Sequence, residues 1–361
     1  MYQLRGSTFL RRRPYWQTWF VYPAVLLLGT LSAGSCKKDS DTGGTAIVPG
    51  GPGVYIAGYE NNSAGKRVAR YWKNGQAVSL TDGINHAFAQ SIFVTDKDVY
   101  VSGEEFTPAG MRIAKYWKNG VPVNLSDGTK ETYALSIFVS GADVYVCGEE
   151  ATPTGRKAKY WKNGVAYDLT DGIRMAFAYD IFVAGTDVYV AGGEHNGTLM
   201  IAKYWKNGSG ISLGNGMQSG ELRSVFVAGN DIHAAGFESG GPQEFAKYWK
   251  NGTGFPLANG NFQSIGHDVF VDGTDVYISG MERNAAGMPV AKYWKNGIPV
   301  ALSDGSKNEE AIRIFVSGAD LYVAGTEYVP GSLRVKYWKN GTAVYLTDGT
   351  QSAYALSLYV K

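Results

Sequence analysis

The chain has 361 residues, 44% of them hydrophobic, so it can build a sizeable core and is not wholly disordered. Glycine (48 residues) and tyrosine (24) are frequent, as in short strands joined by tight turns. Basic and acidic residues nearly balance at 34 and 32, which argues against a nucleic-acid partner. Two cysteines exclude a disulfide framework, and with only four histidines we expect no metal and no cofactor.

Residues 1–35 have the layout of an export signal. A basic segment containing Arg5 and Arg11 precedes an apolar run from Phe20 to Leu31. Small residues then lead to Cys36. The apolar run is short for a stable transmembrane span, although an uncleaved anchor is an alternative.

The segment Ala33-Gly34-Ser35-Cys36 resembles the lipobox of bacterial lipoproteins, with alanine where leucine is usual. The following Lys37-Lys38-Asp39 is also typical of such proteins. The resemblance implies that Cys36 is acylated and becomes the mature N-terminus, which would anchor the chain in a membrane. We therefore expect a lipid-anchored protein of the cell envelope, on the outer membrane, either periplasmic or surface-exposed. An ordinary secreted protein is the alternative.

The polar, glycine-rich residues 36–53 are expected to form the lipidated cysteine and a flexible tether. Removal of residues 1–35 takes four arginines and no acidic residue, so 30 basic and 32 acidic residues remain. The mature chain would then carry a net charge of −2, and the basic character belongs to the signal.

Residues 54–361 contain seven copies of one unit of about 44 residues. The segment Tyr-Trp-Lys-Asn-Gly recurs in every copy, with its tryptophan at positions 72, 117, 161, 205, 249, 294 and 338. Each unit holds four strand-like pieces, here called a to d in chain order. In the third unit they are Ser136–Val139, Val144–Gly148, Ala158–Lys162 and Val165–Leu169. Asn-Gly between strands c and d indicates a two-residue type I′ hairpin.

The predicted fold is all-β: a seven-bladed β-propeller with four antiparallel strands per blade. The first unit begins at strand b, at Val54, and the chain ends after a strand a, Ser357–Val360. We therefore expect the C-terminal strand to pair into the first blade and close the ring, which removes the free sheet edges. A monomeric disc is the expected state.

The units resemble kelch-type repeats, with a strand ending in glycine, a loop and then a tyrosine on strand c, and they are also similar to the bacterial HAF repeat. The double glycine of kelch occurs only at Gly192-Gly193, and tryptophan lies on strand c rather than on d. The resemblance covers residues 54–361 and implies a propeller that binds a protein or a glycan, while a minority of such propellers carry catalysis.

If strand a is innermost, the a–b and c–d turns share one face of the disc, the bottom face. The b–c and d–a connections share the other, the top face. Positions repeated in all seven units are best explained as scaffold. One is a lysine after each tryptophan, expected in solvent on the bottom face, with a surface for anionic lipid or polysaccharide as the alternative. Another is a glutamate column starting with Glu60, Glu105 and Glu150, expected opposite Arg67, Arg112 and Arg156. A carboxylate rim for cations or sugars is the alternative.

Positions that differ between units are candidates for specificity. One column of the d–a connections contains aromatic and acidic side chains, and a second column follows two residues later, close to the predicted channel mouth. Aromatic and polar groups also stand on the b–c connections. The candidate ligand-binding residues are Phe88, Gln90, Tyr133, Phe177, Tyr179, His195, Glu221, Arg223, Phe237, His267, Glu310, Tyr328 and Tyr354. Such a surface suits sugars or a protein partner.

The sequence contains no Gly-x-Ser-x-Gly elbow, no P-loop and no His-Glu-x-x-His. We expect His233 and Cys147 to be core residues. The predicted function is therefore non-catalytic binding of a protein or a glycan by an envelope lipoprotein, through the top face. Two alternatives remain open: a glycan-processing enzyme whose unique acid pair sits in the channel, and a structural component of an envelope assembly.

Overall fold

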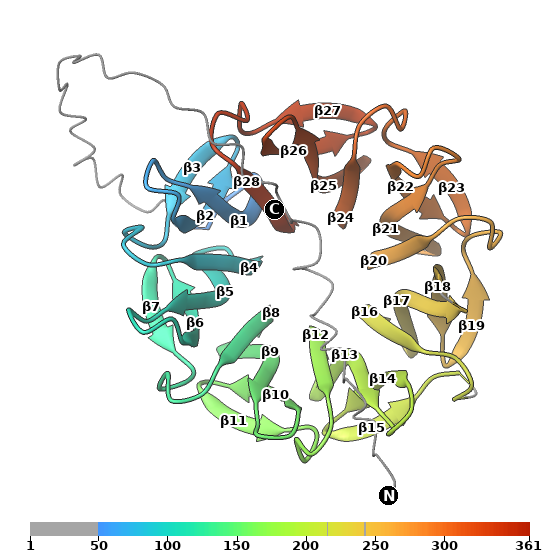
Figure 1. The fold of residues 1–361 in the computed structure, drawn as a ribbon, viewed down its shortest axis with the longest axis horizontal. Helices are drawn as coiled ribbons and strands as arrows, with labels where there is room; N and C mark the ends of the chain where they lie inside the picture. Colours follow the sequence, from blue (N-terminus) through green and yellow to red (C-terminus); the bar gives the residue numbers. More distant parts are fainter. Residues whose placement is uncertain (1–49, 215, 242) are drawn as a thin grey trace, which may run out of the picture. The chain divides into compact units, whose positions relative to one another are not determined.

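The computed structural model describes residues 50–361, apart from residues 215 and 242. Within this part, 28 strands form seven four-stranded antiparallel sheets, which stand around a central channel like the blades of a propeller (Figure 1). This confirms the predicted fold class. The calls on the signal, on Cys36 and on most of the tether lie outside the described residues. In the described part of the chain, no helix is long and apolar enough to cross a membrane.

Each blade lists its strands from the channel outwards. Blade 1 is β28 (Ala353–Val360), β1 (Val54–Asn61), β2 (Arg67–Lys73) and β3 (Gln76–Ser79). Blade 2 is β4 (Ala87–Val94), β5 (Val99–Phe106), β6 (Arg112–Lys118) and β7 (Val121–Asn124). Blade 3 is β8 (Thr132–Ser140), β9 (Asp143–Ala151), β10 (Arg156–Lys162) and β11 (Val165–Asp168). Blade 4 is β12 (Ala176–Ala184), β13 (Asp187–His195), β14 (Met200–Lys206) and β15 (Ser209–Ser212).

The remaining three blades repeat this order. Blade 5 is β16 (Gly220–Ala228), β17 (Asp231–Gly240), β18 (Gln243–Lys250) and β19 (Thr253–Pro256). Blade 6 is β20 (Ser264–Asp272), β21 (Asp275–Arg283), β22 (Pro289–Lys295) and β23 (Ile298–Ala301). Blade 7 is β24 (Glu309–Ser317), β25 (Asp320–Val329), β26 (Ser332–Lys339) and β27 (Thr342–Tyr345).

The ring closes as predicted, because the C-terminal strand β28 pairs antiparallel with β1 in blade 1. The backbone of Gly53 exchanges two hydrogen bonds with that of Lys361, at 2.9 and 3.0 Å. The first and last described segments of the chain therefore complete one sheet, and β1 has no free edge.

The repeated Asn-Gly forms the c–d hairpin for a physical reason. The asparagine adopts φ of 48–52° in all seven blades, a left-handed conformation that few residues other than asparagine and glycine accept. In blade 3 the Asn163 side chain also accepts a hydrogen bond from the Val144 amide and donates one to Asp143. These bonds tie the c–d hairpin to the a–b turn and place both on the bottom face, as expected.

The predicted hairpin lysines of the bottom face are not left alone in solvent. Six of the seven form an ion pair with the aspartate that begins strand b, at 2.7–3.1 Å, as Lys295 does with Asp275. The seventh, Lys73, lies over the ring of Tyr55. Because these charges cancel in pairs, the hairpins give the bottom face little net positive charge.

The core lies between the blades. All seven strand-c tryptophans are at most 2% exposed. Trp117 of blade 2, for example, packs against Tyr55, Ala57 and Tyr71 of blade 1. The predicted structural role of the repeated tryptophan is therefore confirmed, as are those of Cys147 and His233, which are buried.

Near the bottom end of the channel, seven aromatic rings form a closed circle. One side chain comes from the innermost strand of each blade, and neighbouring centroids lie 4.8–5.2 Å apart with tilts of 42–55°. These spacings are those of favourable aromatic pairs. The members are Phe93, Phe138, Phe182, Phe226, Phe270, Phe315 and Tyr359.

Candidate functional site

The innermost strand of every blade contains a β-bulge close to its top end. In blade 3, Ala134 pairs with Gly148 and Ser136 pairs with Cys147, so Leu135 is the extra residue. The other six described sheets are interrupted in the same way. The second predicted column of variable residues is therefore the set of bulged residues, which explains why these side chains can be turned towards the channel mouth.

The repeated glycine of strand b lies opposite the bulge. A Cβ atom on Gly148 would stand 1.9 Å from the carbonyl oxygen of Tyr133, and the six other blades give 1.8–2.1 Å for the equivalent pair. No side chain can be accommodated at such a distance, so the bulge requires glycine at this position. An invariant scaffold residue thus sets the direction of a variable one.

Five side chains from blades 3 to 6 converge at the top of the channel, and we call them the mouth cluster: Glu149, Tyr179, Glu221, Arg223 and His267. Arg223 Nη2 lies 2.9 Å from Glu221 Oε2, and the Arg223 guanidinium stacks on the Tyr179 ring, 4.4 Å from its centroid. The charge of Glu221 raises the pKa of Glu149 from two blades away. Arg223 in turn lowers the pKa of His267 in the next blade.

The mouth cluster contains groups with opposite titration behaviour. Burial raises the pKa of Glu149 to about 7, although its ion pair with Arg156, at 2.6 Å, lowers it. Burial also lowers the pKa of His267 to about 3, helped by the positive charges of Arg223 and Arg313. His267 is therefore neutral at physiological pH, whereas Glu149 changes charge close to neutrality.

Three buried atoms of the mouth cluster make no hydrogen bond with the described protein: Glu149 Oε2, Arg223 Nε and His267 Nε2. They provide a carboxylate acceptor, a guanidinium donor and a ring nitrogen. Buried polar atoms are nearly always paired with protein, water or ligand. These atoms are thus where a polar ligand would find unused hydrogen-bonding capacity.

Beside the mouth cluster, Tyr133 lies between two arginines. The guanidinium carbons of Arg112 and Arg156 are 4.5 and 4.7 Å from its ring centroid. Glu131 lies within 3.4 Å of Arg112 and 3.6 Å of Arg156. Guanidinium groups therefore cover the Tyr133 ring, which is not the open platform that the sequence suggested.

Gln90 and Glu104 lie next to this stack, in blade 2. The Gln90 side chain donates a 2.9 Å hydrogen bond to Glu104 Oε1. Glu104 is fully buried, and burial raises its pKa to about 7 against the positive charge of Arg112. Blades 2 and 3 thus repeat the same buried glutamate–arginine arrangement.

Glu310 does not join Glu221, Arg223 and His267, with which it was grouped as a possible convergent set. It accepts a 3.1 Å hydrogen bond from the Tyr354 hydroxyl, and burial raises its pKa. The Tyr354 ring stacks on Tyr59, 6.1 Å away, while Phe88 meets Tyr59 edge-on at 5.1 Å. Three candidate residues therefore form a separate aromatic group where blades 7, 1 and 2 meet.

The remaining aromatic candidates differ in exposure. Phe177 stacks on Tyr179 and is 7% exposed. Phe237 is 5% exposed, so its prediction as an exposed loop residue was wrong. The reason is that strand β17 continues past it to Gly240, where the sequence suggested a loop. Tyr328 is 37% exposed and lies on the rim of blade 7.

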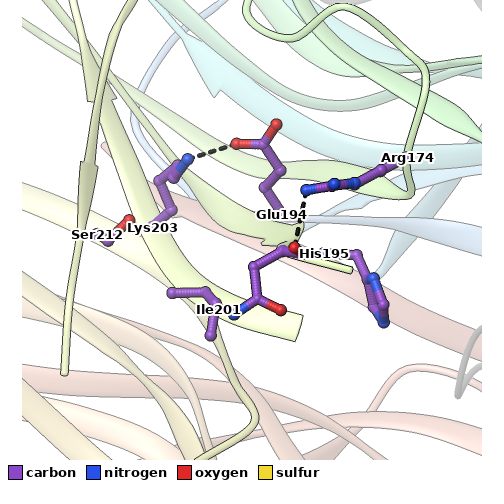
Figure 2. A pocket seen from close by; sticks show the side chains of 7 residues that line it. Arg174, Glu194, His195, Ile201, Lys203 and Ser212 are labelled. Carbon is purple, nitrogen blue, oxygen red and sulfur yellow. Dashed lines mark hydrogen bonds and ion pairs between the residues drawn. The ribbon is translucent and has the colours of Figure 1, made fainter. Parts of the chain in front are cut away.

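His195 lies away from the mouth cluster, in a small hollow of about 210 Å³ on blade 4 (Figure 2). The wall carries an ion pair between Lys203 and Glu194, and Arg174 donates a 2.8 Å hydrogen bond to the Asn196 carbonyl. His195 Nδ1 accepts from the Gly197 amide. The hollow shares no residue with the mouth cluster.

The predicted opposition of the glutamate column and the arginines was wrong by one residue. Glu105 pairs with Ile113 in the ladder, while Arg112 lies opposite Phe106. A shift of one residue moves a side chain to the other face of the sheet. Each column glutamate instead contacts the basic residue two positions before the tryptophan, as Glu150 does with Lys159 at 2.6 Å. The same ion pair occurs in all seven blades.

Below the bulges, a buried polar network crosses the channel, and the sequence analysis missed it. Ser224 Oγ lies 2.9 Å from Asp180 and 2.8 Å from Asp268. Arg313 donates to Asp268 at 2.9 Å. The signal was present in the repeats, because this column is serine in four units and charged in three. Glu104 and Glu149 were missed similarly, in a variable column from which only Phe237 was selected.

No family model and no curated protein matches the chain. Solved structures similar to it include Trypanosoma rangeli sialidase in complex with sialic acid (TM-score 0.45, 11% identity, 79% of this chain and 56% of that chain). Others are an AofleA mutant from Arthrobotrys oligospora (0.42, 10%, 70% and 85%) and YjhT (0.40, 10%, 72% and 97%). The chain thus spans little more than half of the sialidase. At this level of similarity no activity or ligand transfers to this chain.

Proposed function

We propose that this chain is a kelch- or HAF-like propeller, carried on an envelope lipoprotein as a monomeric disc, that binds a glycan without cleaving it. The mouth cluster is the proposed binding site. The observation that carries the proposal is the set of unpartnered buried atoms on Glu149, Arg223 and His267, which gather at the one open end of a channel that polar and aromatic rings fill below.

The charge balance of the region favours a neutral saccharide. The acids Glu131, Glu149 and Glu221 stand against the two guanidinium groups of Arg156 and Arg223, and Glu149 is partly protonated near pH 7. An anionic ligand would meet carboxylates and a cationic one would meet guanidiniums. Sugar hydroxyls both donate and accept hydrogen bonds, so they can satisfy the acceptor of Glu149 and the donor of Arg223 together.

A glycan-cleaving enzyme is the second candidate, and one observation favours it. A carboxyl with a pKa of about 7, as in Glu149, has the protonation behaviour of a general acid, and Glu221 is near enough to influence that pKa. Binding remains the first proposal because Glu149 and Glu221 are each occupied by an arginine, Arg156 and Arg223. A protein ligand and a role in envelope assembly remain outcomes of the test.

The test is a broad glycan array probed with residues 50–361, which close the ring on themselves, in the presence and absence of EDTA. We expect EDTA-insensitive binding of neutral saccharides that weakens at least tenfold in Arg223→Met and Tyr179→Ala. The matched control is Tyr167→Ala, because Tyr167 is an exposed residue of the outer strand β11.

Three outcomes would contradict the proposal. Release of reducing sugar that stops in Glu149→Gln would identify an enzyme. A folded disc that binds no glycan but is cross-linked to one envelope protein would identify a protein ligand or an assembly role. Glycan binding that Tyr167→Ala removes and Arg223→Met leaves unchanged would move the site to the outer surface.

A further inference from the structure

The start of the described chain is fixed to the bottom face of the disc. The Gly50 amide donates a 3.1 Å hydrogen bond to the carbonyl of Lys97, in the a–b turn of blade 2. The Tyr55 hydroxyl donates to the Gly51 carbonyl at 2.7 Å and accepts from the Gly51 amide at 3.1 Å. Gly53 pairs with Lys361. Residues 50–53, assigned to the tether from the sequence, are therefore part of the bottom face.

The contact at Gly50 is specific to glycine. A Cβ atom there would lie 2.3 Å from the Thr95 carbonyl oxygen and 2.9 Å from that of Asp98. The chain can reach this position only with its backbone pressed against the a–b turn. The a–b turns join the two innermost strands, so the chain leaves the disc close to the channel axis, on the side opposite the mouth cluster (Figure 1).

We infer that the bottom face of the disc faces the membrane and that the mouth cluster faces away from it. The partner of the bottom face is thus a lipid surface. This inference rests on the lipid anchor at Cys36 that forms part of the proposed function. Residues Cys36 and Gly50 are 14 peptide links apart, which is at most about 50 Å of chain.

Chain length makes the opposite orientation unfavourable. To bring the top face to the membrane, the chain must pass three strand spacings outwards, about 14 Å, and then the height of an eight-residue strand, about 27 Å. That path uses about 40 Å of the available 50 Å before any side chain is cleared. It therefore leaves the chain almost fully extended, at a large cost in conformational entropy.

The form of the bottom face agrees with this orientation. Its turns are short, two residues in the a–b turn between Ser140 and Asp143 and two in the c–d hairpin between Lys162 and Val165. Its hairpin lysines are paired with aspartates, so the face is flat and nearly neutral. It can lie close to a bilayer without repelling it, and the anchor rather than charge would hold it there.

The test measures energy transfer from labels on the protein to an acceptor on lipid headgroups. Four exposed loop alanines supply matched positions: Ala142 and Ala319 on the bottom face, Ala109 and Ala285 on the top face. Each is changed to cysteine in the full chain, in the variants A142C, A319C, A109C and A285C. After acylation the Cys36 sulfur is blocked and Cys147 is fully buried, so the dye reacts at the new cysteine.

In vesicles carrying the acylated protein, we expect transfer at both bottom positions to exceed that at both top positions at least twofold. Because Ala142 and Ala319 lie in blades 3 and 7, equal values for them also exclude a disc standing on its edge. Equal transfer from both faces, or more from the top face, would overturn the inference.

A separate arm keeps the orientation testable if Cys36 is not acylated. In that case the lipoprotein part of the proposed function fails. The chain from residue 36 onwards, with Cys36→Ser and a hexahistidine tag ahead of it, is then held on nickel-chelating lipids and labelled at the same four positions. The same twofold excess at the bottom positions supports the orientation, and its absence overturns it.

Discussion

The guanidinium of Arg313 reaches across the channel to the carboxylate of Asp180, which belongs to a strand three blades away. The two groups are 3.5 Å apart, and Arg313 also donates to Asp268 of the adjacent blade at 2.9 Å. Burial raises the pKa of Asp268, and the charge of Arg313 lowers it. One arginine therefore neutralises two buried carboxylates and links blades 4, 6 and 7 inside the ring.

We expect Arg313→Met to lower the free energy of unfolding by about 3 kcal/mol at neutral pH, because it leaves Asp180 and Asp268 buried without a counter-charge. The measurement is urea denaturation followed by tryptophan fluorescence. The matched control is Lys118→Met, which removes an exposed ion pair with Asp98 and should cost at most about 1 kcal/mol. Equal effects of the two substitutions would show that the channel network contributes no more than a surface pair.

Ring closure by β28 should decide whether the disc is cooperative and monomeric. Deletion of residues 353–361 leaves β1 with an unpaired edge and removes Tyr359 from the aromatic circle. We expect a broad unfolding transition and self-association in size-exclusion chromatography with light scattering. Deletion of Lys361 alone is the control, since it keeps the strand. A monomeric, sharply unfolding truncated protein would contradict the closure argument.

Glu327 should stabilise the fold in a pH-dependent way. Burial acts to raise its pKa, but hydrogen bonds from Lys307, Lys336 and Tyr345 outweigh burial and lower the pKa to about 2. A depressed pKa gives stability that is complete above the unfolded value near 4.5 and is lost as the pH falls towards 2. Glu327→Gln should therefore be less stable than the wild type at pH 6, by about 1–3 kcal/mol. The difference should shrink between pH 4.5 and 2.5 in thermal unfolding scans.

Glu149 should show the opposite sign. Its pKa in the folded protein is about 7, above the unfolded value near 4.5, so the folded state holds a proton that the unfolded state has released. Wild-type stability from this group falls as the pH rises from 4.5 to 7. We expect Glu149→Gln to gain about 1–2 kcal/mol relative to the wild type between pH 5 and pH 8. A constant difference over that range would mean that Glu149 is ionised throughout.

The same two groups separate the sources of any pH dependence in ligand binding. His267 is neutral above about pH 3, so it cannot change charge between pH 5 and 8. A change in affinity over that range should persist in His267→Gln and disappear in Glu149→Gln. Titration of the best array ligand by calorimetry at pH 5, 6, 7 and 8 measures this. Loss of the pH dependence in His267→Gln would assign it to the imidazole.

The repeats made the scaffold predictable, because each invariant residue has a local reason. Asn163 is needed for the left-handed hairpin, Gly148 for the bulge and Trp161 for packing between blades. The site was predicted less well. Tyr179, Glu221, Arg223 and His267 were identified as variable residues near the mouth and do converge, whereas Glu310 belongs elsewhere and Glu149 was missed. Variation between units showed which positions are free to differ, but not which of them meet.

The sequence by itself determined the number of blades, the hairpins and the closure of the ring, since these follow from chain period and from local backbone preferences. Only the tertiary structure decided which side chains pair across the channel and between blades. Arg313 and Asp180 are 133 residues apart and meet only because the ring is closed. The partner of Glu105 depended on a register that one residue can invert. Contacts of this kind arise from the curvature of the whole ring, which no single repeat contains.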